Sequence, residues 1–216
     1  MKIFQVSGDY FKKEYLDEAV TLLQKGEVIA FPTDTLYGIG VDLKNEDAVK
    51  KIYEIKNRPA SMPLILLGAT KEDLIPYVLD WPPLAERLAQ DFWPGGLTII
   101  LKKSFKVPDY VVSGFETVGI RVPNHKVIQK ILEEYGDPIA TTSANISGNA
   151  PISTGRYVAE ELEDTDLALL LDAGKTPITE ASTVIDLSDE NRPLILRKGA
   201  ISPENLGLDL DLYENE

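Results

Sequence analysis

Short β-rich runs alternate with amphipathic helical stretches along the whole chain, and this alternation constrains the fold more than any other feature of the sequence. No Ser/Gly-rich linker, low-complexity tract or internal repeat interrupts the alternation. Such a pattern is typical of an α/β domain in which helices cover a sheet. Because some strands follow one another without a helix between them, we predict a single domain with a twisted, open, mixed sheet flanked by helices.

Capping and breaking residues set the expected helix boundaries. The first helix covers about residues 10–25 and stops at Gly26, and Asn45 caps a second helix that ends at Lys56. Further helices are expected from Thr70 to Leu79, with Asp73 completing a capping box, from Pro82 or Pro83 to Trp93, and from Asn124 to Gly136. The expected strands lie within residues 28–31, 63–67, 97–102, 118–122, 138–142, 167–174, 182–187 and 194–199.

Acidic residues dominate the charge of the chain. Asp and Glu number 35 against 22 Lys and Arg, which gives a formal net charge of −13 and argues against a protein that coats nucleic acid. Residues 203–216 contain five acids and no base, so we expect a loose acidic tail after a domain that covers residues 1–202. Lysines and arginines nevertheless cluster within residues 50–58, and a local cationic site remains possible in this acidic chain.

The chain contains no cysteine and only one histidine, His125. This composition excludes disulfides, thiolate zinc sites, cysteine nucleophiles and multi-histidine metal cages. We expect His125, in the first turn of a helix, to be structural. The amino-terminal sequence does not resemble a signal peptide, and the longest apolar runs are too short to span a bilayer, so a cytoplasmic protein without membrane contact is expected.

Three hydroxyl-rich segments, at residues 32–38, 141–148 and 181–183, are expected to form loops at strand ends. Each segment alone is compatible with ordinary turn chemistry. Ligand sites on open α/β sheets gather at the carboxyl ends of strands, so three such segments on one sheet indicate a candidate site.

Four basic side chains are candidates for binding an anion at that site. Lys56 and Arg58 lie two residues apart where a helix stops, so both heads could converge on a polyphosphate, although a solvated helix end is the alternative. Arg121 and Arg197 each close a β run and would lie near the same edge if their strands share a direction. An exposed strand arginine is the alternative for each of these two.

Six segments resemble motifs of the YrdC/Sua5/TsaC family, the L-threonylcarbamoyladenylate synthases. They are FPTDTLYGIG, KIYEIKNRP, FWPGGLTIIL, VGIRVPNH, TTSANISG and STVIDL, in the order and approximate spacing of the family, and the resemblance covers about residues 10–200. It implies a twisted open sheet around a positively charged cavity. The implied reaction joins L-threonine, bicarbonate and ATP, with Mg²⁺ accompanying ATP, into threonylcarbamoyl-AMP and pyrophosphate.

The resemblance also implies a place in tRNA modification. The product would feed the t6A modification at position 37 of tRNA. The length resembles the short, TsaC-like form, so separate proteins would transfer the threonylcarbamoyl group and direct tRNA binding would be weak or absent.

The resemblance also implies site residues, which we assign to this sequence by their place in the matching motifs. Those that resemble the family's threonine contacts are Thr35, Arg121, Ser143 and Ser182. Those that resemble its ATP contacts are Lys56, Arg58, Thr117, Asn145, Ser153 and Arg197, with Lys56 and Arg58 expected to act on the reacting phosphates. Met62 stands where a Lys or Asn often precedes the proline, and Leu67 stands where longer members often carry a His.

Two other functions compete with this one. An isolated basic concavity could bind RNA, as in a ribosome-maturation protein without catalysis, but the net charge and the lack of Lys/Arg runs interleaved with aromatics argue against it. Alternatively, the chain could form a carbamoyladenylate for another acceptor, as related domains of hydrogenase-maturation proteins do. The acylphosphatase and zinc-finger regions of those proteins are not found in this sequence.

Overall fold

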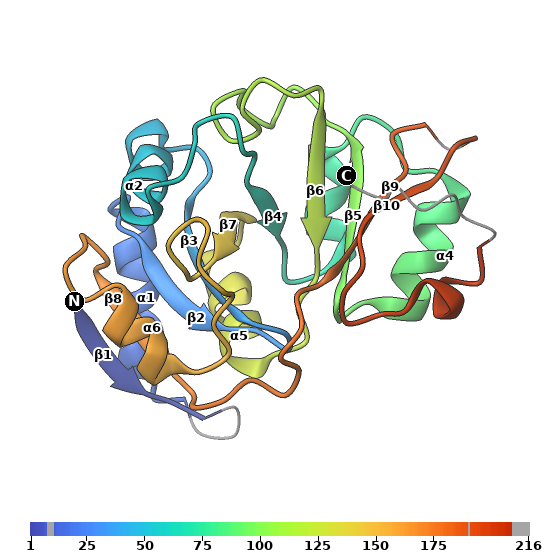
Figure 1. The fold of residues 1–216 in the computed structure, drawn as a ribbon. Coiled ribbons are helices and arrows are strands. Elements are labelled where there is room, and N and C mark those ends of the chain that lie inside the picture. Colours follow the sequence, from blue (N-terminus) through green and yellow to red (C-terminus); the bar gives the residue numbers. More distant parts are fainter. Residues whose placement is uncertain (8–10, 190, 209–216) are drawn as a thin grey trace.

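The computed structural model describes residues 1–7, 11–189 and 191–208 (Figure 1). Its strands are β1 Lys2–Gln5, β2 Ile29–Pro32, β3 Tyr37–Asp42, β4 Ile65–Leu67, β5 Leu97–Lys102, β6 Thr117–Arg121, β7 Ile139–Ser143, β8 Leu169–Asp172, β9 Thr183–Asp186 and β10 Leu194–Arg197. Its α-helices are α1 Lys13–Gln24, α2 Glu46–Lys56, α3 Lys71–Leu74, α4 Pro83–Phe92, α5 Lys126–Tyr135 and α6 Gly155–Glu161, and its 3₁₀ helices are η1 Ile75–Tyr77 and η2 Pro203–Leu206.

The strands form one ten-stranded sheet in the order β1-β8-β2-β3-β7-β4-β6-β5-β9-β10. The sheet contains both parallel pairs, such as β4 with β6, and antiparallel pairs, such as β3 with β7. The mixed sheet predicted from the sequence is therefore confirmed. The antiparallel neighbours β2 and β3 follow one another in the sequence and need only a turn between them, whereas the parallel pairs of the described sheet join strands that are not consecutive in the sequence.

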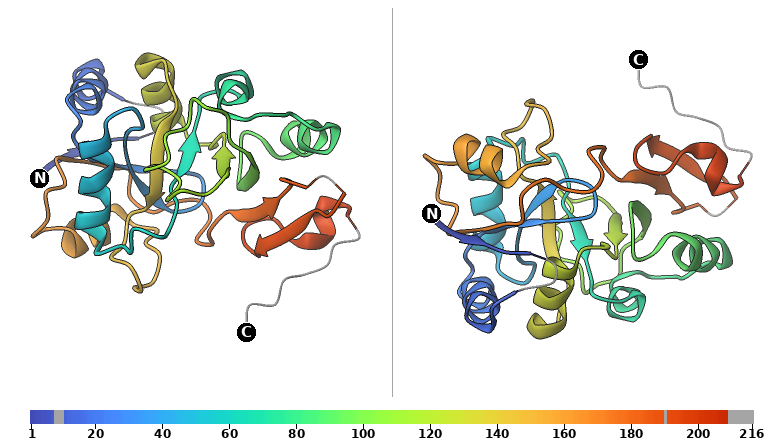
Figure 2. Two further views of the ribbon diagram at one scale, coloured as in Figure 1. Left: turned by 90° about the horizontal axis from the view of Figure 1, so that it is seen from above. Right: turned by 90° about the horizontal axis from the view of Figure 1, so that it is seen from below.

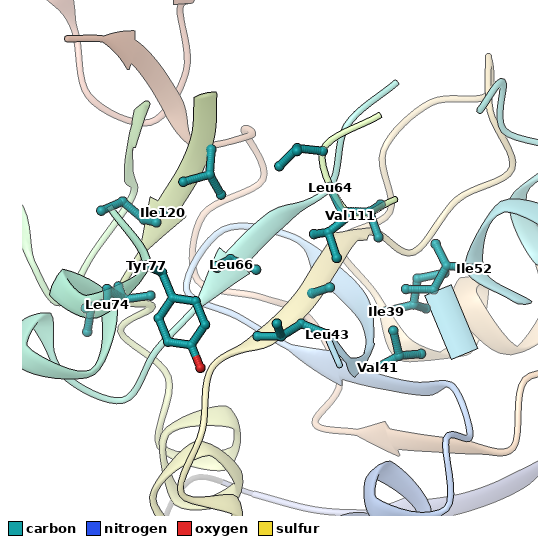
Figure 3. Packing of buried hydrophobic residues seen from close by; sticks show 14 of the residues in the cluster. Ile39, Val41, Leu43, Ile52, Leu64, Leu66, Leu74, Tyr77, Val111 and Ile120 are labelled. Carbon is teal, nitrogen blue, oxygen red and sulfur yellow. The ribbon is translucent and has the colours of Figure 1, made fainter. Parts of the chain in front are cut away.

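Helices cover both faces of the sheet, as Figure 2 shows edge-on. Helices α1 and α5 pack on one face, where Leu23 and Ile131 lie in a buried cluster with Phe31 of β2. On the other face, α2 and α6 contribute to a second, larger cluster. Figure 3 shows part of that cluster, with Ile39 of β3, Leu66 of β4 and Ile120 of β6. Burial from both sides explains why the central strands are apolar runs without alternation.

Most helix ends follow the capping residues of the sequence. The Asn45 side chain accepts a hydrogen bond from the Ala48 amide at 3.0 Å, and Thr70 forms a capping box with Asp73. The helix expected to continue to Leu79 instead passes into the 3₁₀ turn η1 and ends at Tyr77, because Pro76 cannot donate a backbone hydrogen bond.

The cap assigned to Asn124 is wrong. His125 is the N-cap of α5, and its Nδ1 accepts a hydrogen bond from the Val127 amide at 3.3 Å. The half-buried ring thus has a structural role, and burial lowers its pKa. The backbone amide of Asn124 donates to Asp34 instead.

Two strands were not predicted from the sequence. Strand β1 pairs in parallel with β8 at the sheet edge, and three of its four residues are exposed, which hides the strand pattern. Strand β3 begins at Tyr37, inside the segment expected to be a loop, so the turn after β2 is shorter than predicted. Gly38 and Gly40 interrupt the β-branched pattern by which strands are recognised.

The carboxyl-terminal part of the described chain is more ordered than expected. Pro203–Leu206 form the 3₁₀ helix η2, and Leu206 is buried in the larger core cluster. These residues therefore belong to the packed domain and not to a loose tail, whereas residues 209–216 of the predicted tail lie outside the described residues. None of the helices within the described ranges has the length and apolar character needed to cross a membrane.

Candidate active site

A cavity of about 300 Å³ extends over one face of the sheet. Seven consecutive strands of the sheet contribute to its wall, with Tyr37 of β3, Ser143 of β7, Leu67 of β4, Arg121 of β6, Thr98 of β5, Val184 of β9 and Arg197 of β10. Residues 181–182 line the cavity before β9 and not after a strand, which corrects the expected position of this segment. The site therefore lies across the sheet face and is not confined to one edge.

Three arginines, Arg58, Arg121 and Arg197, line the cavity, and no acidic residue is found among its lining residues in the described chain. The other polar lining groups are mainly hydroxyls of Thr and Ser. Burial lowers the pKa of all three guanidiniums, and the charge of Arg121 adds to this effect at Arg197. The arrangement favours a ligand with several negative charges, since an anion would offset both desolvation and mutual repulsion.

Arg121 is held in place at three nitrogens. Its Nε donates to the Gly95 carbonyl at 2.8 Å, its Nη1 to Thr35 Oγ1 at 3.0 Å, and its Nη2 to Asp34 Oδ1 at 2.6 Å. The side chain is almost fully buried, and its ion pair with Asp34 opposes the pKa-lowering effect of burial. A guanidinium fixed in this way presents its remaining N–H groups in a constant orientation.

Arg197 reaches the cavity because of a β-bulge. Ile195 opposes Ile185 in β9, but Arg197 opposes Val184, so β10 has one extra residue, Leu196, at this point. Cross-strand partners share a face of the sheet, and Val184 lines the cavity. Without the bulge Leu196 would occupy this position, so the extra residue turns Arg197 toward the cavity.

Two contacts to Ser182 then fix the Arg197 head. Its Nε donates to the Ser182 carbonyl and its Nη2 donates to Ser182 Oγ, and each donor–acceptor distance is 3.0 Å. Strands β6 and β10 run in the same direction, which confirms the condition under which Arg121 and Arg197 were expected to lie close.

Arg58 approaches the cavity from the end of α2. Asn57 adopts the left-handed conformation, with φ 47°, and ends the helix. Arg58 Nε then donates to the Met62 carbonyl at 3.2 Å and Nη2 to the Pro63 carbonyl at 3.0 Å. These bonds hold the guanidinium at the cavity wall while leaving other N–H groups for a ligand.

Lys56 is 1% exposed and is not among the cavity-lining residues. Its Nζ donates to the Ser143 carbonyl at 2.5 Å and to the Asn145 carbonyl. The Lys56 carbonyl accepts from the Ser147 amide at 2.8 Å, so both ends of the residue fasten the segment after β7. Burial and, to a lesser extent, the charge of Arg58 lower the pKa of Lys56 to about 7, against the opposing effect of Glu161.

The structure brings together six of the ten predicted site residues at the cavity: Thr35, Arg58, Arg121, Ser143, Ser182 and Arg197. Lys56 and Asn145 lie behind the wall, where the Asn145 amide oxygen accepts from Ser143 Oγ at 2.5 Å. Thr117, at the start of β6, and Ser153, whose carbonyl accepts from the Thr176 amide, are not in the lining. Met62 and Leu67, the two departures from the family pattern, both line the cavity.

Asp34 and Thr98 are polar residues of this site that sequence reasoning did not single out. Asp34 lies among hydroxyl residues of a turn, where an acidic residue is common and does not indicate a binding site. In the structure it forms an ion pair with Arg121. Thr98 lies within the apolar run LTIIL, but its hydroxyl is 2.8 Å from Ser182 Oγ in the cavity wall. A polar residue inside a buried strand is the signal that could have identified it.

The cavity wall can position a ligand and supplies positive charge. Its described lining contains no cysteine or histidine that could act as a nucleophile. No group of three or more His, Cys, Asp or Glu suited to a metal ion occurs within the described ranges. Such a site can hold an anionic substrate in a fixed orientation and stabilise negative charge that develops during group transfer.

Comparisons with known proteins agree with this chemistry. Residues 21–199 match the model of the Sua5/YciO/YrdC family, which is described as "Telomere recombination". A protein named threonylcarbamoyl-AMP synthase from Pyrococcus abyssi is 42% identical over 188 residues, covering 87% of this chain and 55% of the relative. A protein of the same name from Vibrio parahaemolyticus is 36% identical over 185 residues, covering 85% and 98%.

Among solved structures, P. abyssi Sua5 complexed with L-threonine matches this fold with a TM-score of 0.94 at 36% identity. The match covers 99% of this chain and 63% of the other. This chain thus spans little more than half of the Pyrococcus relative and almost the whole of the Vibrio relative.

Proposed function

The chain belongs to the Sua5/YciO/YrdC family, and on that basis we propose that it is an L-threonylcarbamoyladenylate synthase. Its substrates are L-threonine, bicarbonate and ATP, and its products are threonylcarbamoyl-AMP and pyrophosphate. The observation that carries the proposal is the convergence of Arg58, Arg121 and Arg197 on one hydroxyl-lined cavity. Both the amino acid, as its carbamate, and ATP are polyanions that such a cavity suits.

The reaction needs no side-chain nucleophile. The threonine amine attacks bicarbonate, a water equivalent is lost, and N-carboxythreonine forms. A carboxylate oxygen of that carbamate then forms a bond to the α-phosphorus of ATP, while the bond from the α-phosphorus to the bridging oxygen breaks and pyrophosphate leaves. The enzyme contributes alignment of the two anions and stabilisation of charge on the transferring phosphoryl group.

Threonine contacts in this proposal are Thr35, Arg121, Ser143 and Ser182. All four line the cavity, and Arg121 is already bonded to Thr35, so one rigid unit would bind the amino acid. The free N–H groups of Arg121 would pair with the substrate carboxylate, to which a guanidinium matches better than an ammonium.

ATP contacts in this proposal are Lys56, Arg58, Thr117, Asn145, Ser153 and Arg197. Arg58 and Arg197 at the cavity wall support a phosphate site directly. Lys56 lies behind the wall, so a direct contact would require its Nζ to exchange a carbonyl of Ser143 or Asn145 for a phosphate oxygen. Phosphate binding would then also rearrange the segment after β7.

Mg²⁺ is proposed to enter with ATP. The cavity wall supplies hydroxyls and carbonyls but no carboxylate within the described lining, so phosphate oxygens and water would form most of the coordination shell. When bound, the ion would screen phosphate charge. The roles of the protein residues given above do not depend on a protein-held metal.

We place this reaction before the t6A modification of tRNA at position 37, in the cytoplasm. Other proteins would transfer the threonylcarbamoyl group, because the cavity is small and the chain is strongly acidic. An RNA-binding protein without catalysis and a carbamoyladenylate synthase for another acceptor are the alternatives, and nucleotide consumption and the acceptor requirement distinguish them.

One assay tests the proposal. Purified full chain is incubated with ATP, Mg²⁺, bicarbonate and radiolabelled threonine, and the products are separated. We expect a labelled adenylate and stoichiometric pyrophosphate, both of which disappear in CO₂-free buffer. Product formed equally well without bicarbonate would indicate simple aminoacyl adenylation, and the absence of any nucleotide consumption would favour the RNA-binding alternative.

A further inference from the structure

The Thr98 hydroxyl is a polar group in an otherwise apolar stretch of β5. Thr98 is 1% exposed and lines the cavity, and its Oγ1 lies 2.8 Å from Ser182 Oγ. Within the described ranges, the Thr98 hydroxyl has no other hydrogen-bond partner. Strand β5 pairs with β6 on one side and β9 on the other, so the backbone of Thr98 is fixed and its hydroxyl has a constant position relative to Ser182.

Ser182 Oγ also accepts from Arg197 Nη2 at 3.0 Å. A serine hydroxyl has one proton to donate and two lone pairs that accept. Arg197 fills one lone pair. If Thr98 donates, it fills the second, and the Ser182 proton remains for a group in the cavity. If Ser182 donates to Thr98 instead, Ser182 offers the cavity only a lone pair.

We infer that Thr98 is a positioning residue for the amino-acid substrate and acts through Ser182, an inference that rests on the proposed function. A substrate carboxylate can only accept hydrogen bonds, so its presence beside Ser182 selects the order Thr98 to Ser182 to carboxylate oxygen. Donation from both Thr98 and Arg197 to Ser182 Oγ polarises its O–H bond and makes the Ser182 proton a better donor. Thr98 thereby strengthens substrate binding without touching the substrate.

Calorimetric titration of L-threonine into the full chain tests this role. Thr98→Val keeps the shape of the side chain and removes the hydroxyl, and we expect the threonine Kd to rise about three- to tenfold, the equivalent of one ordinary hydrogen bond. Thr98→Ser retains the hydroxyl and should bind nearly as the wild type does. Thr98→Ala serves in place of Thr98→Val should the latter lower the melting temperature strongly.

A double-mutant cycle separates this role from a purely structural one. Because Thr98 acts through Ser182, Thr98→Val should cause no further loss of affinity when it is added to Ser182→Ala. Thr183→Val is the matched control. Thr183 is buried next to Ser182 and bonded to the Ile201 carbonyl at 2.6 Å but does not line the cavity, so its variant should lose thermal stability and keep the threonine Kd.

The possible failures are distinguishable. If the wild type binds threonine and Thr98→Val binds it equally well, the role of Thr98 is overturned while the proposed function stands. If the threonine Kd of the double variant rises by the product of the two single-variant factors, the role is also overturned, because Thr98 then acts independently of Ser182. A wild type that neither binds threonine nor forms the adenylate overturns the proposed function and this inference together.

Discussion

Asp34 lies behind the cavity wall and forms a buried ion pair with the cavity-lining Arg121, with 2.6 Å between Asp34 Oδ1 and Arg121 Nη2. Only 8% of the Asp34 side chain and 6% of the Arg121 side chain are exposed. The same Asp34 oxygen accepts from the Asn124 amide at 2.9 Å, so it links the turn after β2 to the segment after β6. Asp34 thus both neutralises and orients the guanidinium that is proposed to bind the amino acid.

Asp34→Ala should destabilise the protein strongly. The substitution leaves the buried Arg121 charge without its partner, and breaking a buried pair in this way costs about 3–5 kcal/mol. Urea unfolding measures the loss. Asp17→Ala is the matched control, because Asp17 forms an exposed pair with Lys13 and its loss should change the free energy of unfolding by less than about 1 kcal/mol. Equal effects of the two substitutions would contradict a stabilising role for the Asp34 pair.

Arg121→Ala should raise the threonine requirement far more than the ATP requirement. The variant also leaves Asp34 unpaired and will contain less folded protein. Both Michaelis constants are therefore measured on the same preparation, because inactive protein lowers the rate but leaves each KM unchanged. Arg121→Lys should restore little, since an ammonium cannot reproduce three directed bonds to Gly95, Thr35 and Asp34. A proportionate rise in both constants would assign Arg121 a shared or structural role.

Arg58→Ala should weaken the use of ATP. A charge-assisted bond to phosphate contributes on the order of 1.5–3 kcal/mol, so the ATP requirement should rise roughly 10- to 150-fold. The fold should survive, because Arg58 is only partly buried and bonds two carbonyls at the surface of the segment after α2. Arg156→Ala, which removes an exposed guanidinium paired with Glu160 on α6, serves as the control. Full activity of Arg58→Ala at limiting ATP would refute the phosphate contact.

Lys56 gives the stability of the protein a specific dependence on pH. Burial lowers its pKa from the ordinary 10.5 to about 7, so between these values the unfolded chain binds more protons than the folded chain. The free energy of unfolding must then rise with pH across this window, by at most about 1.4 kcal/mol per pH unit. Lys56→Met lacks this contribution. The difference in free energy of unfolding between wild type and Lys56→Met should therefore increase from pH 7 to pH 9.

Lys50→Met is the control for that experiment. Lys50 lies on the same helix but is exposed and paired with Glu46, so its loss should produce no comparable pH dependence in this window. A wild-type and Lys56→Met difference that stays constant with pH would contradict the lowered pKa. Truncation of Lys56 should also lower the stability of the protein, because it removes the bonds from Nζ to the Ser143 and Asn145 carbonyls.

Local sequence signals predicted the parts of the fold that local physics decides. Asn45 and the Thr70–Asp73 capping box mark helix starts because their side-chain bonds span only three residues. Pairing of β1 with β8 joins residues about 167 positions apart, and no local pattern contains that partner. The strand order of the sheet was unpredictable for the same reason.

The same difference between local and long-range signals applies to the candidate site. Arg121 and Arg197 could be proposed from their places at the ends of β runs, and their strands do run in one direction. The bulge at Leu196, which decides that Arg197 faces the cavity, depends on register with β9 and leaves no signature in the sequence. Lys56 is a basic residue at a helix end, a position that predicts exposure to solvent. The segment after β7 covers it in the structure, and no local sequence pattern indicates that contact.

The protein alone should bind tRNA weakly, and that binding should disappear with modest salt. Its net charge is −13, and the acidic segment at residues 160–166 repels a polyanion. The arginines that could attract RNA converge on one cavity of about 300 Å³, where ATP phosphates would occupy them during turnover. ATP and tRNA should therefore compete if they meet there, and fluorescence anisotropy of labelled tRNA at low and physiological salt, with and without ATP, measures this. Sub-micromolar tRNA binding in physiological salt with saturating ATP would contradict the prediction, because a second cationic surface outside the cavity would then be required and the adenylate would be transferred on a bound tRNA.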